Sequence, residues 1–172
     1  MSYKNLRSYQ QATIIYDYTA KFCELYVAKF SRTYDQMVQA GRSGKQNIVE
    51  GSSERTSKKS ELKLLGVARA SLQELLEDYE DFLRQGGLSL WDKDSPKAKA
   101  VRGLAYKTYT TYRTYRTYIK SAETAANTAI CLINQTNFLL DRQISVLENK
   151  FVNDGGYTEN LFKKRLIKRT LK

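Results

Sequence analysis

Apolar residues recur at intervals of three and four through the middle of the chain, between Gln46 and Leu83. Such spacing places side chains on one helix face that can be buried. Polar residues 52–57 interrupt the stretch, so it predicts an antiparallel helical hairpin. We expect Gly51 to end the first helix in the left-handed conformation and Ser57 to cap the second, which runs to about Gln85. The stripe of this second helix consists of Leu62, Leu65, Ala68, Leu72, Leu75, Leu76, Tyr79, Phe82 and Leu83.

The N-terminal part of the chain contains two predicted helices, over residues 8–30 and 34–51. The inward stripe of the first consists of Ile15, Tyr18, Phe22, Leu25 and Tyr26. The second carries Gly41 and Gly44 on the same face as Met37, Val38 and Ile48. Glycine inside a helix costs about 1 kcal/mol relative to alanine. Two glycines on a packing face therefore predict that another backbone approaches closely.

Residues 95–120 are rich in tyrosine, lysine and arginine and contain no acidic residue. Ser95 and Pro96 suit the start of a helix, so we predict one inserted Tyr-rich helix over 95–120. Its tyrosines recur at every third residue, at Tyr106, Tyr109, Tyr112, Tyr115 and Tyr118. Three residues turn an α-helix by about 300°, so the rings would wrap around it and some would be exposed. A strand remains the minor alternative, because its period is two residues.

A long helix is predicted from the cap Ser121 to about Val152, and a tail helix from Thr158. The core face of the long helix consists of Ala126, Ile130, Ile133, Leu140, Ile144, Leu147 and Phe151. Asn137 shares that face and needs a buried hydrogen-bond partner. The chain is therefore predicted to be all-α: an antiparallel four-helix bundle over residues 1–153, with the additional Tyr-rich helix, and a short basic C-terminal helix over 154–172.

The net charge of the chain indicates a class of binding partner. Its 172 residues include 29 Lys and Arg against 18 Asp and Glu, a net charge of +11. Such a charge attracts polyanions, either nucleic acid or an anionic membrane surface, although a basic protein without such a partner is also possible. Because no apolar stretch could span a bilayer and no signal peptide opens the chain, we expect a cytoplasmic location without membrane contact.

The residues that most enzymes use are missing. The sequence has no histidine, so the commonest general base and metal ligand is absent, and Cys23 and Cys131 have no imidazole to activate them. Residues 41–45 contain two glycines and a lysine without phosphate-loop spacing. The acidic residues near Glu77 and Asp81 fit a solvated helix face better than a cation site. We expect a non-enzymatic protein without cofactor or metal.

A family resemblance rests on residues 47–51, Asn-Ile-Val-Glu-Gly, and on the residues that follow them. The motif consists of Asn47, Glu50, Gly51, Arg55, Ser57 and Glu61. It resembles the bacterial four-helix-bundle family of proteins encoded in ribosomal RNA intervening sequences, with accessory proteins of diversity-generating retroelements as relatives. Residues 134–141 and the tail resemble the branch with a C-terminal suffix. The resemblance covers about residues 10–152 and implies a bundle, often a homopentamer, with nucleic-acid contacts in some relatives.

The polar residues of this motif are interpreted as structural. Asn47 and Glu50 would fix the helix end by hydrogen bonds to the backbone, since such side chains compete for local backbone groups. Arg55 is a candidate ion-pair partner of Glu50 or Glu61. The signature therefore identifies a fold, and the functional residues are sought in the two basic segments.

The leading functional hypothesis is non-specific binding of RNA or DNA by an oligomeric bundle. Tyr112 and Tyr115 would stack on bases, since aromatic rings among cations bind nucleic acid in this way. The residues expected to contact phosphates are Lys107, Arg113, Arg116, Lys163, Lys164, Arg165, Lys168 and Arg169. The competing interpretation of the Tyr-rich segment is a helix whose tyrosines fill interfaces, and the tail helix could also pack on another subunit.

The second hypothesis is a protein-interaction scaffold. Exposed tyrosines and the acidic end of the 57–85 helix could dock a partner such as a reverse transcriptase or a ribosome-associated factor. Association that survives nuclease treatment would separate this hypothesis from nucleic-acid binding.

Overall fold

A computed structural model describes residues 2–53, 57–107 and 110–170. All secondary structure within these ranges is helical, which confirms the predicted all-α class. The α-helices are α1 Arg7–Tyr26, α2 Arg32–Gly51, α3 Lys58–Gln85, α4 Pro96–Leu104, α5 Ala122–Asp154 and α6 Tyr157–Thr170. Two 3-10 helices, η1 Tyr3–Asn5 and η2 Tyr112–Lys120, complete the described elements.

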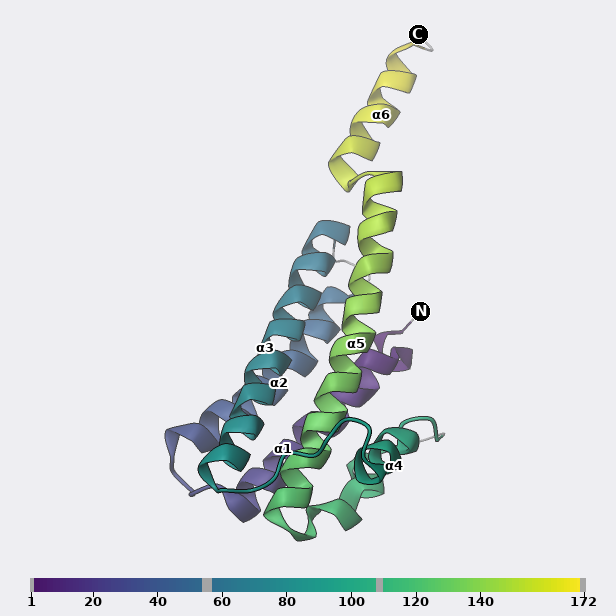
Figure 1. Cartoon of the computed structure of the whole chain (residues 1–172). Coiled ribbons are helices and arrows are strands. Elements are labelled where there is room, and N and C mark those ends of the chain that lie inside the picture. The colour runs from purple at the N-terminus through teal and green to yellow at the C-terminus, as the bar shows by residue number, and fades with distance from the viewer. Residues whose placement is uncertain (1, 54–56, 108–109, 171–172) are drawn as a thin grey trace.

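Four of the helices pack side by side around the core (Figure 1). Helix α2 lies against α1 and α3, and α5 lies against the same two helices. The contact between α2 and α3 confirms the predicted hairpin. Helix α4 and η2 cover the part of α5 opposite to the end from which α6 projects. The largest completely buried side chains are Tyr18, Tyr79, Tyr115, Phe22, Ile15, Met37, Ile48, Leu65, Leu72, Leu75, Leu83 and Leu132.

Serine caps begin four of the helices. The Oγ atoms of Ser31, Ser57, Ser95 and Ser121 each accept a hydrogen bond from the backbone N–H three residues later. Such caps satisfy donors that have no partner within the helix. The predicted caps at Ser57, Ser95 and Ser121 are therefore confirmed. The loop between α3 and α4 contains Gly87 with φ of 63°, so this glycine adopts the left-handed conformation.

The glycines of α2 serve close packing. A Cβ on Gly41 would lie 3.4 Å from Tyr16 Cα, and one on Gly44 would lie 2.8 Å from Leu72 Cδ2. The predicted close approach is thus confirmed for both. The predicted left-handed conformation of Gly51 is wrong, because Gly51 is the last residue of α2 and does not have a positive φ. It is buried, and a Cβ there would lie 3.3 Å from Leu64 Cβ.

Helix α1 is shorter than predicted. It ends at Tyr26, and Val27 is extended with φ of −112° and ψ of 138°. The chain must reverse before the cap Ser31, so the residues between them cannot stay helical. The prediction that Leu25 faces inward is wrong, since it is exposed within α1, and Phe30 is 91% exposed with φ of 70°.

The prediction of one helix over 95–120 is wrong. Helix α4 covers nine residues, and the later tyrosines lie on η2, a 3-10 helix of nine residues. A 3-10 helix has three residues per turn, so every third side chain lies on the same face. Tyr112, Tyr115 and Tyr118 therefore share one face, and all three pack against the core. Tyr109 lies outside the described residues.

Backbone acceptors fix η2 onto the core. The Tyr26 hydroxyl donates to the carbonyl of Ile119 at 2.6 Å, and the Tyr18 hydroxyl donates to the carbonyl of Ala125 at 3.2 Å. Both tyrosines belong to α1, so this helix holds the end of η2 and the start of α5 together. The face of η2 that carries the tyrosine rings is consequently part of the core.

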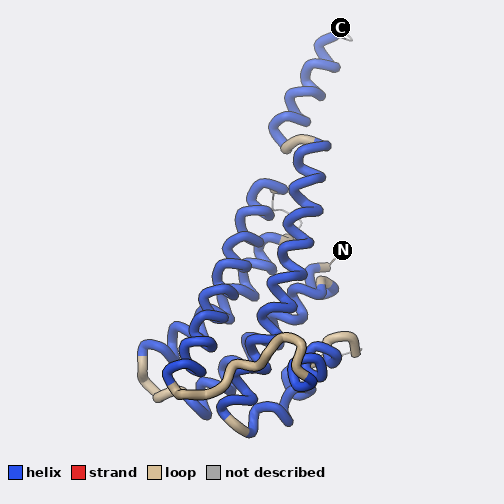
Figure 2. The backbone as a smooth tube through the Cα atoms, viewed as in Figure 1, coloured by secondary structure: helices blue, strands red, loops and turns tan. Residues whose placement is uncertain are grey.

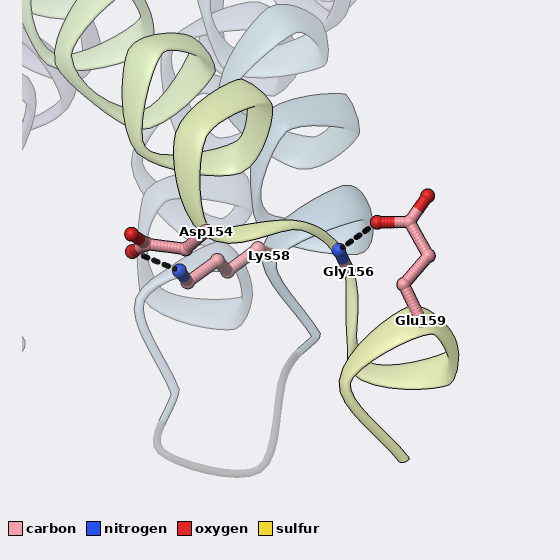
Figure 3. A network of polar contacts seen from close by, with 4 residues as sticks. All are labelled: Lys58, Asp154, Gly156 and Glu159. Carbon is pink, nitrogen blue, oxygen red and sulfur yellow. Dashed lines mark hydrogen bonds and ion pairs between the residues drawn. The ribbon is translucent and has the colours of Figure 1, made fainter. Parts of the chain in front are cut away.

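Helix α6 projects beyond the other helices (Figure 2). Its described residues include no buried side chain, and Gly155, with φ of 71°, separates it from α5. Figure 3 shows the joint: Lys58 pairs with Asp154 at 3.1 Å, and the Gly156 N–H donates to Glu159 Oε2 at 2.9 Å. The predicted basic C-terminal helix is confirmed as a helix. Among the described helices, none has an apolar stretch of the length needed to cross a membrane.

Candidate nucleic-acid interface

A cavity of about 880 Å³ opens where α4 lies beside α5 and the start of α1. We call it the α4–α5 cavity. It is lined by Arg7, Gln11, Lys93, Asp94, Lys99, Arg102, Gly103, Ala105, Tyr106, Asn134, Gln135, Phe138, Leu139 and Arg142. The lining combines cations, aromatic rings and amides, the side-chain types that contact phosphates and bases.

Helix α4 is held against α5 by its apolar side and by one side-chain hydrogen bond. Ala98 and Val101 are buried, and Gln135 Nε2 donates to the Arg102 carbonyl at 3.1 Å. Because Lys99 follows Ala98 directly, burying Ala98 and Val101 leaves Lys99 on the exposed side of α4. The cavity wall on α4 is thus a consequence of how that helix packs.

The connection between α3 and α4 brings Lys93 and Asp94 to the cavity. Asn127 fixes its path, because Asn127 Oδ1 accepts from the Trp91 N–H at 2.7 Å and Asn127 Nδ2 donates to the Ser89 carbonyl at 2.8 Å. Asn127 is itself buried in α5. One buried amide therefore holds an extended connection in place.

The charges of the cavity are unbalanced. Asp94 is the acidic residue of the lining, against the cations Arg7, Lys93, Lys99, Arg102 and Arg142. The ion pairs within the described residues involve Lys21, Lys58, Arg69 and Arg84, so they include none of these five cations. Concave surfaces lined by one sign of charge raise the local concentration of the opposite ion. The cavity is therefore built to attract an anion.

Two aromatic side chains of the lining are exposed. Tyr106 is 84% exposed and Phe138 is 60% exposed. The Arg142 guanidinium lies 5.8 Å from the centre of the Phe138 ring, within the range of a cation–π interaction. Large apolar rings in contact with solvent are suited to stacking on a flat ligand.

Buried amide groups lie beneath this surface without partners. The Oε1 atoms of Gln11 and Gln135 are buried, and no hydrogen bond within the described residues reaches them. Asn137 is 4% exposed and both its side-chain polar atoms are unpartnered in the same sense. The predicted requirement that Asn137 finds a buried partner is therefore not met. Buried amide atoms without a partner are rare in folded proteins, and these lie on α1 and α5, two of the three helices around the cavity.

The structure corrects the predicted stacking residues. Tyr115 is 0% exposed, and burial, followed by the neighbouring Tyr118, raises the pKa of its hydroxyl to about 12. Tyr112 is half-buried against the core. The Tyr115 ring cannot stack on a base, because the 3-10 geometry turns it into the core. Tyr112 keeps part of its surface exposed, so its predicted stacking stays a prediction.

The predicted phosphate contacts fall in separate places. Lys107, Arg113 and Arg116 are exposed, on the turn after Tyr106 and on η2. The cations of α6 are also exposed: Lys163, Lys164, Arg165, Lys168 and Arg169. Helix α6 lies at the end of the molecule away from α4 (Figure 1), so the structure does not bring these two groups together.

The family-motif residues have structural positions. Asn47 Nδ2 donates to the Ser43 carbonyl at 2.9 Å, so it does bond to the backbone, but within α2 and not at the helix end where this bond was predicted. Burial raises the pKa of the Glu61 carboxyl, and the charges of Lys150 and Lys58 partly offset this effect. Glu50 is exposed, and Arg55 lies outside the described residues, so its predicted pairing stays a prediction.

The remaining candidates for chemistry lie apart from the cavity. Cys23 and Cys131 are buried, and burial raises the pKa of both thiols. Within the described residues, no three His, Cys, Asp or Glu side chains form a group that could hold a metal ion. A polar groove of about 700 Å³ between α2 and α3 is lined in part by Asp35, Glu74 and Asp78.

No family model, no curated protein and no solved structure matches the chain. The family suggested by residues 47–61 therefore remains a prediction, and the case for a function rests on the residues of this chain.

Sequence reasoning missed most of the cavity. Its α5 wall carries a polar residue, a ring and a cation four residues apart, at Asn134, Phe138 and Arg142. Arg7 and Gln11 repeat the same spacing on α1. Positions four residues apart share a helix face, so this signal was present. Whether residues with this spacing line a common cavity depends on which helices become neighbours, and tertiary packing decides that.

Proposed function

We propose that this protein is a non-enzymatic helical protein that binds RNA or DNA through basic surfaces, centred on the α4–α5 cavity. The observation that supports this best is the group of five cations, outside every described ion pair, around two exposed rings. Cations supply phosphate contacts without sequence information. Exposed rings supply sequence-tolerant stacking.

The other exposed cations extend this surface. Lys107 directly follows Tyr106, and Arg113 and Arg116 lie on the outer side of η2. These residues and the cations of α6 would add weaker attraction along a bound strand, because dissolved salt screens the interactions of exposed charges. Binding would therefore be non-specific and strongly dependent on salt.

The finer architecture belongs to the same proposal. We infer that α1, α2, α3 and α5 form an antiparallel four-helix bundle, supported by the contacts of α2 and of α5 with both α1 and α3. We also retain the predicted homo-oligomer, which light scattering tests. Exposed apolar residues near the α5–α6 joint, including Val152 and Tyr157, give a second copy a surface to cover.

The test is a titration of a short labelled oligonucleotide of mixed sequence, followed by fluorescence anisotropy from low to high salt. The variant Lys99→Gln/Arg102→Gln/Arg142→Gln removes three cavity cations. For single strands the salt slope is about 0.7 per phosphate contact, so we expect its magnitude to fall by roughly 2. Affinity at low salt falls with it.

The matched control removes the same residue types elsewhere. Lys29→Gln/Arg32→Gln/Arg42→Gln changes the net charge equally, at exposed positions that do not line the cavity. We expect a much smaller loss of affinity. Equal losses in the two variants would show that net charge alone attracts the strand, and no binding by the parent protein at low salt would overturn the proposal.

The α2–α3 groove favours a second candidate function, docking of a basic protein segment. Burial, and then the charges of Asp81 and Glu74, raise the pKa of the Asp78 carboxyl at this groove. A cationic partner would relieve this crowding of negative charge. The test is association with a protein partner, such as a reverse transcriptase or a ribosome-associated factor, after nuclease treatment. Loss of all association with nuclease would count against it.

A further inference from the structure

We propose that the α4–α5 cavity receives an unpaired base, so that the preferred ligand is a single-stranded nucleic acid. This inference rests on the proposed function and names its substrate class. It goes beyond charge attraction, which favours duplexes and single strands alike.

The shape of the cavity is the first argument. Its volume of about 880 Å³ leaves room for a base, and the cavity is partly open to solvent, so the rest of a strand could lie along its mouth. A base in a duplex is stacked and paired, so it can enter such a cavity only by leaving the helix, which costs free energy. A base in a single strand can turn into the cavity without breaking a pair.

The aromatic rings are the second argument. A duplex offers its phosphates to a protein surface and keeps the faces of its bases covered. Phosphate contacts would make no use of the Phe138 ring and would use only the hydroxyl of Tyr106, yet both rings are exposed and line the same cavity. Stacking of a base on such a ring is worth roughly tenfold in affinity or more.

The experiment compares three ligands in the same salt: a single strand, the same strand paired with its complement, and a strand of equal length in which the bases are replaced by abasic sites. The abasic strand keeps every phosphate and sugar and loses every base. We expect the single strand to bind about tenfold more tightly than the abasic strand, by the loss of stacking, and more tightly than the duplex.

Two variants locate the effect. Phe138→Leu removes the ring beneath Arg142, and we expect several-fold weaker binding of the single strand with unchanged binding of the abasic strand. Phe30→Leu is the control, since Phe30 is also an exposed ring beside a cation, with Lys29 Nζ 5.5 Å from its centre. It does not line the cavity, so neither ligand should be affected. Circular dichroism confirms that both variants stay folded.

The outcomes separate the inference from the proposed function. If no ligand binds at low salt, the proposed function itself fails. If the single strand, the duplex and the abasic strand bind equally, and Phe138→Leu matches Phe30→Leu, the base site is overturned while phosphate binding stands. If a free mononucleotide binds as tightly as the strand, the inference that a single strand is the preferred ligand is overturned.

Discussion

The two halves of the segment 95–120, which contains no acidic residue, both carry cations and tyrosine but have opposite roles. In the first half, α4 turns its small apolar residues inward and leaves Lys99, Arg102 and Tyr106 at the cavity. In the second half, η2 turns Tyr112 and Tyr115 inward and leaves its arginines outside. The single tyrosine of the first half, Tyr106, is exposed beside Lys107, whereas the described tyrosines of the second half pack against the core.

The difference follows from local geometry, because Tyr106 lies in the turn after α4 and the later described tyrosines lie on a 3-10 helix. A spacing of three scatters side chains around an α-helix and gathers them on one face of a 3-10 helix. The same tyrosine repeat therefore predicts exposed rings in one geometry and a buried face in the other. A composition of aromatics and cations identifies a nucleic-acid surface only after the helix type is known.

The largest expected effect contrasts the two tyrosines. Tyr115→Ala removes a completely buried ring and should lower the free energy of unfolding by about 3–5 kcal/mol, the cost of similar core truncations. Tyr106→Ala removes an exposed ring and should leave stability nearly unchanged while weakening single-strand binding. Urea denaturation and anisotropy measure the two quantities. Equal stability of both variants would mean that the η2 face is not part of the core.

Cations give the next contrast. Lys99→Gln/Arg102→Gln removes two charges at the cavity, and Arg113→Gln/Arg116→Gln removes two from η2. We expect the first pair to lower the magnitude of the salt slope by about 1.4, from about 0.7 for each phosphate contact of a single strand, and the second pair to lower it by much less. Salt titrations of one oligonucleotide compare them. A larger loss from the η2 pair would reverse our assignment of the two halves.

Most of the fold was accessible from the sequence, because burial imposes a period. The stripe of α3 and the caps Ser57, Ser95 and Ser121 followed from spacing and from the chemistry of helix ends. Gly41 and Gly44 signalled a close approach because glycine is costly within a helix. In these cases the structural role of each residue can be inferred from residues close to it in the sequence.

The site was less accessible, because its residues meet only through tertiary packing. Phe138 and Arg142 on α5 belong to the same cavity as Lys99 on α4 and Arg7 on α1. No local pattern states that α4 packs on this part of α5. The tyrosine repeat was visible, but its meaning depended on a 3-10 geometry that is uncommon over nine residues.

The next, smaller effect concerns the charge of Asp94 and tests the electrostatic contribution of the cavity to binding. It is the acidic residue of the cavity lining, so Asp94→Asn should tighten binding a few-fold, in keeping with about 1 kcal/mol or less for an exposed charge. Asp92→Asn, at an exposed position outside the lining, is the control. Weaker binding by the Asp94 variant would mean that this carboxylate organises the cavity.

Tyr115→Phe tests what the buried tyrosine contributes. Its hydroxyl is buried and lacks a hydrogen-bond partner within the described residues, so removing it should change the free energy of unfolding by less than about 1 kcal/mol. Binding should not change. A loss comparable to that of Tyr115→Ala would reveal that the hydroxyl, and not the ring, is the main contribution.

The smallest expected effect concerns Asp78 in the acidic groove between α2 and α3. Burial and neighbouring carboxylates raise the pKa of Asp78. A raised pKa in the folded state means that ionised Asp78 disfavours folding, and this cost disappears as pH falls to the unfolded value of about 4. Asp78→Asn should therefore be slightly more stable at neutral pH, by less than about 1 kcal/mol, and equal to the parent near pH 4. A difference that grows on acidification would contradict the sign.

Photocrosslinking tests the central claim most directly. A single strand carrying photoreactive bases is bound at low salt, irradiated and digested, and the crosslinked peptides are identified by mass spectrometry. We predict crosslinks at Tyr106 and Phe138, the exposed rings of the cavity. Crosslinks confined to α6, at its exposed Tyr157 and Phe162, would contradict the account and place the strand on the tail helix.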